Sequence, residues 1–256
     1  MKHLRKLLFA APAILLCEHA LLAAPPHIAS ISSSGQPVHY EIYDTANALS
    51  PLLVLLPGTS GPEAPLYQSQ AQFFAGHAYT VLVLHYFDAN SSRKPSPENY
   101  RRWVTAVQDL VRSFAGNPQL AHREVVLVGY SLGASIALAA GSEGLPVKAI
   151  AEWYGSLPDE FFYNFKTMPP LLILHGARDS NIPILNAQQL IQLCSLKHLT
   201  CASHIYPDQG HGFTGPALND ADQRTLDLFA HVLHGALPTI ALRHDFRRRT
   251  PSPHPV

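Results

Sequence analysis

The sequence predicts a three-layer α/β fold, in which helices cover both faces of a mainly parallel central sheet. Apolar runs of strand length alternate along the chain with runs of helical length, which is typical of parallel sheets with crossover helices. Neither an internal repeat nor a break in composition divides the chain. Its 256 residues, 47% of them hydrophobic and 14% charged, are enough for one large domain with a sizeable core.

The expected elements follow one another along the chain. An alternating run at 38–43 predicts an edge strand, and the continuous apolar run at 52–56 predicts a strand that is buried on both faces. Ser96 and Pro97 predict the start of a helix that ends near Phe114. Further strands are expected at 79–84, 125–128, 147–153, 171–174 and 202–206, and further helices after Ser131, at 184–196 and at 217–233.

The two ends of the chain predict segments outside this domain. Residues 1–24 begin with basic residues and continue with the apolar run Leu7–Leu16, which is typical of a signal peptide and too short to span a bilayer. We therefore expect an exported protein, periplasmic or secreted, whose α/β domain occupies 25–235. The alternative is a retained, poorly ordered N-terminus. Residues 236–256 predict a flexible tail that is basic and contains proline.

Charge and motif content exclude several classes of function. The 18 basic residues match the 18 acidic ones overall, but acidic residues predominate over 25–242, where the folded body lies. A folded domain with this net negative charge lacks the positive surface that nucleic-acid binding needs. The sequence contains no metal-ligand spacing, no phosphate-binding glycine loop and no dinucleotide fingerprint. We therefore expect no cofactor, no nucleic-acid partner and no integral membrane span.

Two of the three cysteines, Cys194 and Cys201, lie beyond the predicted signal peptide. They fall where one predicted helix ends and the next strand begins, so that a disulfide would close a short loop in an oxidising compartment. The alternative is that both stay reduced and pack as small apolar side chains. The sequence leaves both possibilities open.

The pentapeptide Gly129-Tyr130-Ser131-Leu132-Gly133 has the clearest chemical meaning. It lies between the apolar run at 125–128 and an alanine-rich run at 134–140. A serine between two glycines, preceded by a strand and followed by a helix, is typical of a nucleophile elbow. Such a turn presents the serine hydroxyl at the carboxyl edge of the sheet. Ser131 is therefore the expected nucleophile of a hydrolase.

A serine nucleophile needs a base, and the base needs an acid that fixes its orientation. Asp179 and His211 each follow an expected strand, so both can reach the edge where Ser131 lies, in the chain order Ser, Asp, His. Asp208 is an alternative acid, but it lies too near His211 in sequence to approach the ring easily. The alternative bases are His85, His175 and His204.

An oxyanion hole needs two aligned N–H donors. We expect one to be the amide of Leu132, directly after the nucleophile. The other should come from the glycine-containing loop after the strand at 52–56, where Thr59 is the preferred donor and Ser60 the neighbouring possibility.

Taken together, these segments resemble the dienelactone hydrolase family of the α/β-hydrolases over roughly residues 36–234. The resemblance implies the α/β-hydrolase fold, with Ser131 as nucleophile, Asp179 as acid and His211 as base. The motifs that carry it are Leu56-Pro57-Gly58-Thr59, Gly129-Tyr130-Ser131-Leu132-Gly133, His175-Gly176-Ala177-Arg178-Asp179-Ser180-Asn181-Ile182-Pro183 and Tyr206-Pro207-Asp208-Gln209-Gly210-His211-Gly212-Phe213.

Two departures from the family pattern bear on the substrate. The name-giving enzymes have a cysteine at the position of Ser131, and they carry a glutamate in the loop that here contains Leu56-Pro57-Gly58. Because that glutamate partners the thiol in its resting state, its absence here favours an ordinary ester over dienelactone itself.

The sequence as a whole predicts a serine hydrolase that cleaves a small-molecule carboxylic ester or lactone through an acyl-enzyme. The alternatives are a peptidase or acyltransferase with the same triad, and a catalytically inactive binding protein of the same fold.

The short connection between the strands at 147–153 and 171–174 predicts a lightly covered site. Its aromatic residues can line a pocket or cover the sheet end: Trp153, Tyr154, Phe161, Phe162, Tyr163 and Phe165.

Overall fold

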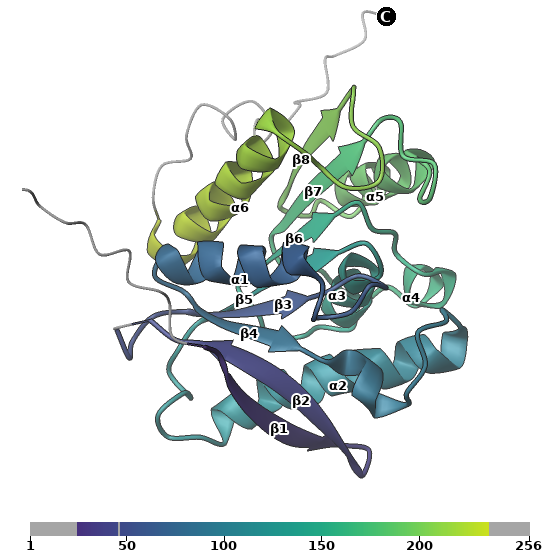
Figure 1. Cartoon of the computed structure of the whole chain (residues 1–256). Coiled ribbons are helices and arrows are strands. Elements are labelled where there is room, and N and C mark those ends of the chain that lie inside the picture. Colours follow the sequence, from purple (N-terminus) through teal and green to yellow (C-terminus); the bar gives the residue numbers. More distant parts are fainter. Residues whose placement is uncertain (1–24, 46, 236–256) are drawn as a thin grey trace, which may run out of the picture.

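The computed structural model describes residues 25–45 and 47–235 of the chain. The predicted signal peptide at 1–24 and the predicted tail at 236–256 lie outside the described residues, so both stay predictions. Eight strands form one sheet in the order β1-β2-β4-β3-β5-β6-β7-β8 (Figure 1). The pairs β1–β2 and β2–β4 are antiparallel and all others are parallel, which confirms the predicted fold class.

The elements alternate between strands and helices over most of the chain. The strands are β1 His27–Ser33, β2 Gln36–Tyr43, β3 Leu52–Leu56, β4 Thr80–Leu84, β5 Val125–Tyr130, β6 Ala149–Trp153, β7 Leu171–Gly176 and β8 Cys201–Tyr206. The helices are α1 Pro65–Gly76, α2 Pro97–Ala115, α3 Leu132–Ser142, α4 Asp159–Tyr163, α5 Leu185–Leu196 and α6 Pro216–His234, with a 3₁₀ turn, η1, at Tyr86–Ala89.

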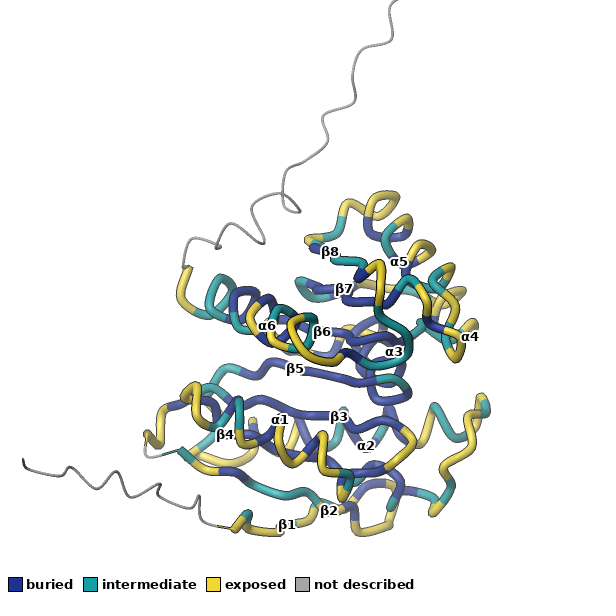
Figure 2. The backbone as a smooth tube through the Cα atoms, turned by 45° about the horizontal axis from the view of Figure 1, so that its top comes forward, coloured by how far each residue is buried: buried dark blue, intermediate teal, exposed yellow. Residues whose placement is uncertain are grey.

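Two apolar cores lie on the two faces of the sheet. Buried residues of α1 and α6 pack on one face, and buried residues of α2, α3 and α5 pack on the other. Strand β5 serves both cores, because Val126 and Val128 face the first while Val125 and Leu127 face the second. Figure 2 shows the central strands buried between helices whose outer sides are exposed. Within the described ranges, the helices are too short or too polar to cross a bilayer.

The edge of the sheet differs from its prediction. The strand expected at 38–43 as an edge strand is β2. It is the second strand of the sheet, because β1, which was not expected, pairs with it and forms the edge. Only the last of the seven residues of β1 is buried, so this strand has no apolar run to reveal it. Helix α1 was also missed, because its glutamines and small residues give it a weak apolar pattern.

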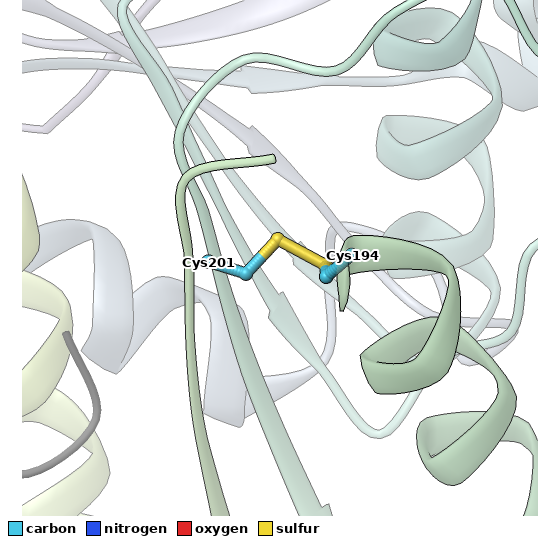
Figure 3. The surroundings of a disulfide bond; sticks show 2 residues. All are labelled: Cys194 and Cys201. Atoms are coloured by element: carbon cyan, nitrogen blue, oxygen red, sulfur yellow. A yellow bond between two sulfur atoms is a disulfide. The ribbon is translucent and has the colours of Figure 1, made fainter. Parts of the chain in front are cut away.

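A disulfide joins Cys194, near the end of α5, to Cys201, the first residue of β8 (Figure 3). The structure thus decides between the two possibilities that the sequence left open. A disulfide is typical of proteins in oxidising compartments, so it agrees with the prediction of export, which stays a prediction.

Removing this disulfide should destabilise the domain without changing its fold. Closing so short a loop restricts the unfolded chain by an amount worth about 2 kcal/mol. We expect the Cys194→Ser/Cys201→Ser variant to unfold about 4–8 °C below wild type in a calorimetric scan. Reductant should lower the wild-type transition similarly and leave that of the variant unchanged. Two thiols that react fully with iodoacetamide in non-reduced, exported wild type would contradict the disulfide.

Candidate active site

Ser131 occupies the sharp turn between β5 and α3. Its backbone has φ 54° and ψ −117°, and a positive φ is strained for a residue with a side chain. The Ser131 N–H donates to the carbonyl of Trp153 at 2.9 Å, which ties the turn to the end of β6. The turn is therefore the predicted elbow, and it holds the hydroxyl at the carboxyl edge of the sheet.

The glycines on either side of Ser131 allow this strand and helix to cross closely. A Cβ on Gly129 would lie 2.5 Å from the carbonyl oxygen of Gly133, well inside van der Waals contact. A Cβ on Gly133 would collide with the carbonyl oxygen of Leu56, at the end of β3. Larger residues at either position would push α3 away and move the serine.

The three predicted catalytic residues form one continuous hydrogen-bonded chain. Ser131 Oγ lies 2.8 Å from His211 Nε2, and His211 Nδ1 lies 2.8 Å from Asp179 Oδ2. The arrangement assigns the proton on Nδ1 to the bond with the carboxylate, which leaves Nε2 free to accept the serine proton. Ser131, His211 and Asp179, the predicted nucleophile, base and acid, thus meet at one edge of the sheet, each from a different loop.

Asp179 is held by more than the histidine. Its side chain is fully buried, and its Oδ1 accepts the backbone N–H groups of Asn181 and Ile182, each at 2.9 Å. These bonds stabilise the carboxylate and fix its direction. The alternative acid, Asp208, instead pairs with Arg178 at 2.6 Å on the surface, and both side chains are mostly exposed.

Among the alternative bases, His175 is the one that lies near the hydrogen-bonded residues Ser131, His211 and Asp179. Its Nε2 lies 3.6 Å from Asp179 Oδ2 and donates to the carbonyl of Ile182 at 2.8 Å. Burial lowers the pKa of His175, so its ring is neutral near pH 7. His85 contacts Glu41 at the β2 side of the sheet, so it does not contact Ser131. His204 lies within β8, where its ring packs on Tyr206.

The predicted oxyanion donors have N–H groups available. Leu132 is the first residue of α3, so no preceding helical turn uses its amide proton. The Thr59 and Ser60 amides make no hydrogen bond to any described residue, whereas their carbonyls accept from Arg93 at 3.4 and 3.1 Å. The Thr59 carbonyl belongs to the same peptide unit as the Ser60 N–H, so the Arg93 contact fixes the direction of the Ser60 amide, whereas the carbonyl in the peptide unit of the Thr59 N–H, that of Gly58, accepts from Gly61 at 3.1 Å. The structure does not choose between Thr59 and Ser60.

The predicted aromatic residues divide between core and site. Tyr154 packs its ring edge-on against His211, with ring centroids 5.0 Å apart, and its φ of 48° is another strained backbone angle beside the triad. Trp153 and Phe161 are buried core residues, whereas Phe162 and Tyr163 are exposed on α4. Phe165 is partly buried against the core of α2 and α3. Tyr154 is thus the residue of this group whose side chain contacts His211, whereas Trp153 contacts Ser131 through its backbone carbonyl.

The structure also places a carboxyl group beside the elbow that sequence reasoning missed. Glu152 lies on β6 opposite Gly129 and is completely buried. One of its oxygens accepts the Gly155 N–H at 2.8 Å, and the other has no partner among the described residues. Burial raises the pKa of Glu152 to about 8, although the Gly155 bond opposes this. An acidic residue inside the apolar run 147–153 was the signal that could have revealed it.

Within the described ranges, no group of three or more histidine, cysteine, aspartate or glutamate residues could hold a metal ion.

Comparison with known proteins points to one family. The profile of the dienelactone hydrolase family matches residues 89–233, which is more than half of the chain. A Salmonella typhimurium protein, described as a candidate carboxymethylenebutenolidase, is 29% identical over 145 residues. That alignment covers 50% of this chain and 53% of the relative, so the chain matches about half the length of this curated protein.

Solved structures share the fold at low sequence identity. Dienelactone hydrolase from Anabaena variabilis superposes with a TM-score of 0.64 at 18% identity, covering 81% of this chain and 97% of the other. An esterase from Pyrococcus furiosus gives 0.65 at 14% identity, covering 81% and 91%. A puromycin-hydrolysing peptidase from Mycobacterium tuberculosis gives 0.67 at 16% identity, covering 82% of this chain and 39% of the other. These likenesses confirm the α/β-hydrolase fold.

The buried Glu152 should make stability depend on pH. In the unfolded chain this carboxyl ionises near 4.5, but in the folded protein only near 8. Between pH 4.5 and pH 8, unfolding therefore releases the Glu152 proton. The contribution of Glu152 to the free energy of unfolding falls as the pH rises through this range and is constant above about pH 8. We expect Glu152→Gln to remove this loss, which amounts to a few kcal/mol, in urea unfolding at pH 5, 6.5 and 8.

The exposed Glu143, at the end of α3, offers a matched control for that measurement. Glu143→Gln should keep the pH profile of wild type. If Glu152→Gln and wild type lost equal stability between pH 5 and 8, Glu152 would be ionised in the folded protein.

Proposed function

Because the chain belongs to the dienelactone hydrolase family, we propose that it is a serine-dependent hydrolase of carboxylic esters or lactones. Ser131 acts as the nucleophile, His211 as the general base and Asp179 as the acid that orients the base. The observation that carries this proposal is the hydrogen-bonded chain from Ser131 through His211 to Asp179, with two contacts of 2.8 Å.

The first half of the reaction forms an acyl-enzyme. His211 Nε2 takes the hydroxyl proton as Ser131 Oγ attacks the substrate carbonyl carbon. The imidazolium that forms is stabilised by the buried carboxylate of Asp179. The carbonyl oxygen becomes an oxyanion, which the amides of Leu132 and Thr59 stabilise as hydrogen-bond donors. When the intermediate collapses, His211 gives its proton to the leaving alkoxide, and the alcohol departs.

The second half returns the enzyme to its starting state. His211, again neutral, takes a proton from water, and the resulting hydroxide equivalent attacks the acyl carbon. The second tetrahedral intermediate collapses to the carboxylic acid, and Ser131 recovers its proton from His211. For a lactone the alcohol stays attached to the acyl group, so one ring-opened hydroxy acid is the product.

The direct test of this proposal is the loss of the nucleophile. We expect wild type to hydrolyse p-nitrophenyl esters and to be labelled at one serine by a fluorophosphonate. Ser131→Ala should lose the label and at least about 10³-fold of the turnover, because the remaining residues contribute only binding and oxyanion stabilisation. A wild type that is never labelled, or an alanine variant with wild-type turnover, would overturn the assignment. A panel of esters and matched amides run on both proteins defines the acyl group preferred.

The acid can be tested against its rival with a matched pair of variants. Asp179→Asn keeps the shape of the side chain but favours the wrong histidine tautomer, so kcat should fall by about 10³–10⁴-fold. Asp208→Asn removes an exposed carboxylate that contacts only Arg178, and should leave kcat within about twofold of wild type. The opposite ranking of the two variants would make Asp208 the acid.

A further inference from the structure

We propose that the phenol of Tyr67 is a third hydrogen-bond donor to the oxyanion, beside the two backbone amides. This inference rests on the proposed function, because it assumes that a tetrahedral intermediate forms on Ser131. Tyr67 is the third residue of α1, the helix that begins directly after the oxyanion loop. Nothing in the triad requires a phenol at this place.

The position of the hydroxyl follows from the space beside Gly58. A Cβ built on Gly58 would lie 2.7 Å from Tyr67 Oη and 3.2 Å from Ser131 Cβ. The phenol oxygen and the nucleophile therefore border the same small volume, which a side chain at position 58 would fill. Gly58 immediately precedes Thr59, so this volume also adjoins the expected oxyanion donor.

The hydroxyl proton of Tyr67 has no acceptor in the described part of the chain. The side chain is only 5% exposed, yet the sole hydrogen bond to its oxygen is one donated by Ser60 Oγ, at 3.4 Å. A buried hydroxyl that is not used as a donor costs free energy, so its retention needs a reason. An oxyanion that forms beside it during the reaction would be the missing acceptor.

The phenol is held rigidly, as a catalytic donor must be. Its ring packs on the ring of Tyr130, with centroids 5.5 Å apart. Tyr130 in turn donates its own hydroxyl to Gln70 Oε1 at 2.7 Å, and this bond ties α1 to the end of β5. The helix that carries the phenol and the strand that carries Ser131 are thus fixed to one another, and little reorganisation is needed when charge develops.

The chemistry needs no proton transfer to or from Tyr67. The ground-state carbonyl oxygen accepts weakly, whereas the alkoxide of the tetrahedral intermediate accepts strongly, so the phenol O–H stabilises the second more than the first. The proton stays on Tyr67 throughout. Ser60, which donates to the phenol oxygen, polarises the O–H and strengthens the bond that Tyr67 donates.

The test compares Tyr67→Phe with a matched variant, Tyr79→Phe. Tyr79 is also buried, 6% exposed, but it packs on Phe74 and Phe229 at the far end of α1. We expect Tyr67→Phe to lower kcat for a p-nitrophenyl ester by about 10–100-fold with little change in KM, less than the loss of a sole donor because two amides remain. Tyr79→Phe should keep wild-type kinetics.

A second readout separates an oxyanion contact from a structural role. An alkylboronic acid forms a tetrahedral adduct on Ser131, so Tyr67→Phe should weaken its inhibition by about the same factor as kcat, while inhibition by the carboxylate product stays unchanged. Equal weakening of both inhibitors, or wild-type kcat in Tyr67→Phe, would overturn the inference. Fluorophosphonate labelling of the same samples shows whether Ser131 is reactive. If wild type is not labelled, the proposed function fails as well; if it is labelled, only the role of Tyr67 fails.

Discussion

Strand β5 and helix α3 cross so closely at Gly129 and Gly133 that neither position has room for a side chain, and this contact determines where Ser131 lies. The serine then takes a strained backbone conformation, with φ 54°. Strain of this kind persists only where the surrounding structure enforces it. Here the enforcing structure is the buried sheet, whose strand β3 meets the helix at the same point through Leu56. The central apolar strands are therefore required for the chemistry as well as for stability.

Two buried carboxyl groups near this elbow differ in their hydrogen bonds. The side chain of Asp179 is fully buried, and both of its oxygens are hydrogen-bonded, Oδ1 to the N–H groups of Asn181 and Ile182 and Oδ2 to the ring of His211. Glu152 is also completely buried, but one of its oxygens has no partner among the described residues, and burial raises its pKa to about 8, so it keeps its proton near neutral pH. Glu152 lies on β6, whereas Asp179 lies in the loop after β7, and the two buried carboxyl groups differ in the number of hydrogen bonds that they make. His175 is also buried near Asp179, and because burial lowers its pKa, its ring is neutral near pH 7.

Most of the fold and the core of the site could be predicted from the sequence, because both depend on local patterns. Buried parallel strands such as β3 are continuous apolar runs, and the elbow has a fixed glycine spacing. Asp179 and His211 follow from the order of strands, since carboxyl ends of parallel strands share an edge. What could not be predicted depends on tertiary contacts. Strand β1 is made by its pairing with β2 rather than by its own composition. Tyr67 and Glu152 belong to no sequence motif. Their place beside Ser131 becomes visible only from the packing of α1 and β6 against the elbow. The disulfide between Cys194 and Cys201 depends on the distance between the two cysteines in space, which their spacing in the sequence does not determine.

The three residues of the proposed triad follow strands that differ in how many neighbouring strands they pair with. Ser131 and Asp179 follow β5 and β7, which have neighbours on both sides, whereas His211 follows β8, which within the described part of the chain pairs with β7 alone. An edge strand has half the ladder bonds of an interior one, so it opens at a lower free-energy cost. Local opening of β8 would displace His211, the proposed base, while Ser131 and Asp179 keep their places. The first step of inactivation on heating would then be a reversible loss of proton transfer, well before the hydrophobic core is exposed.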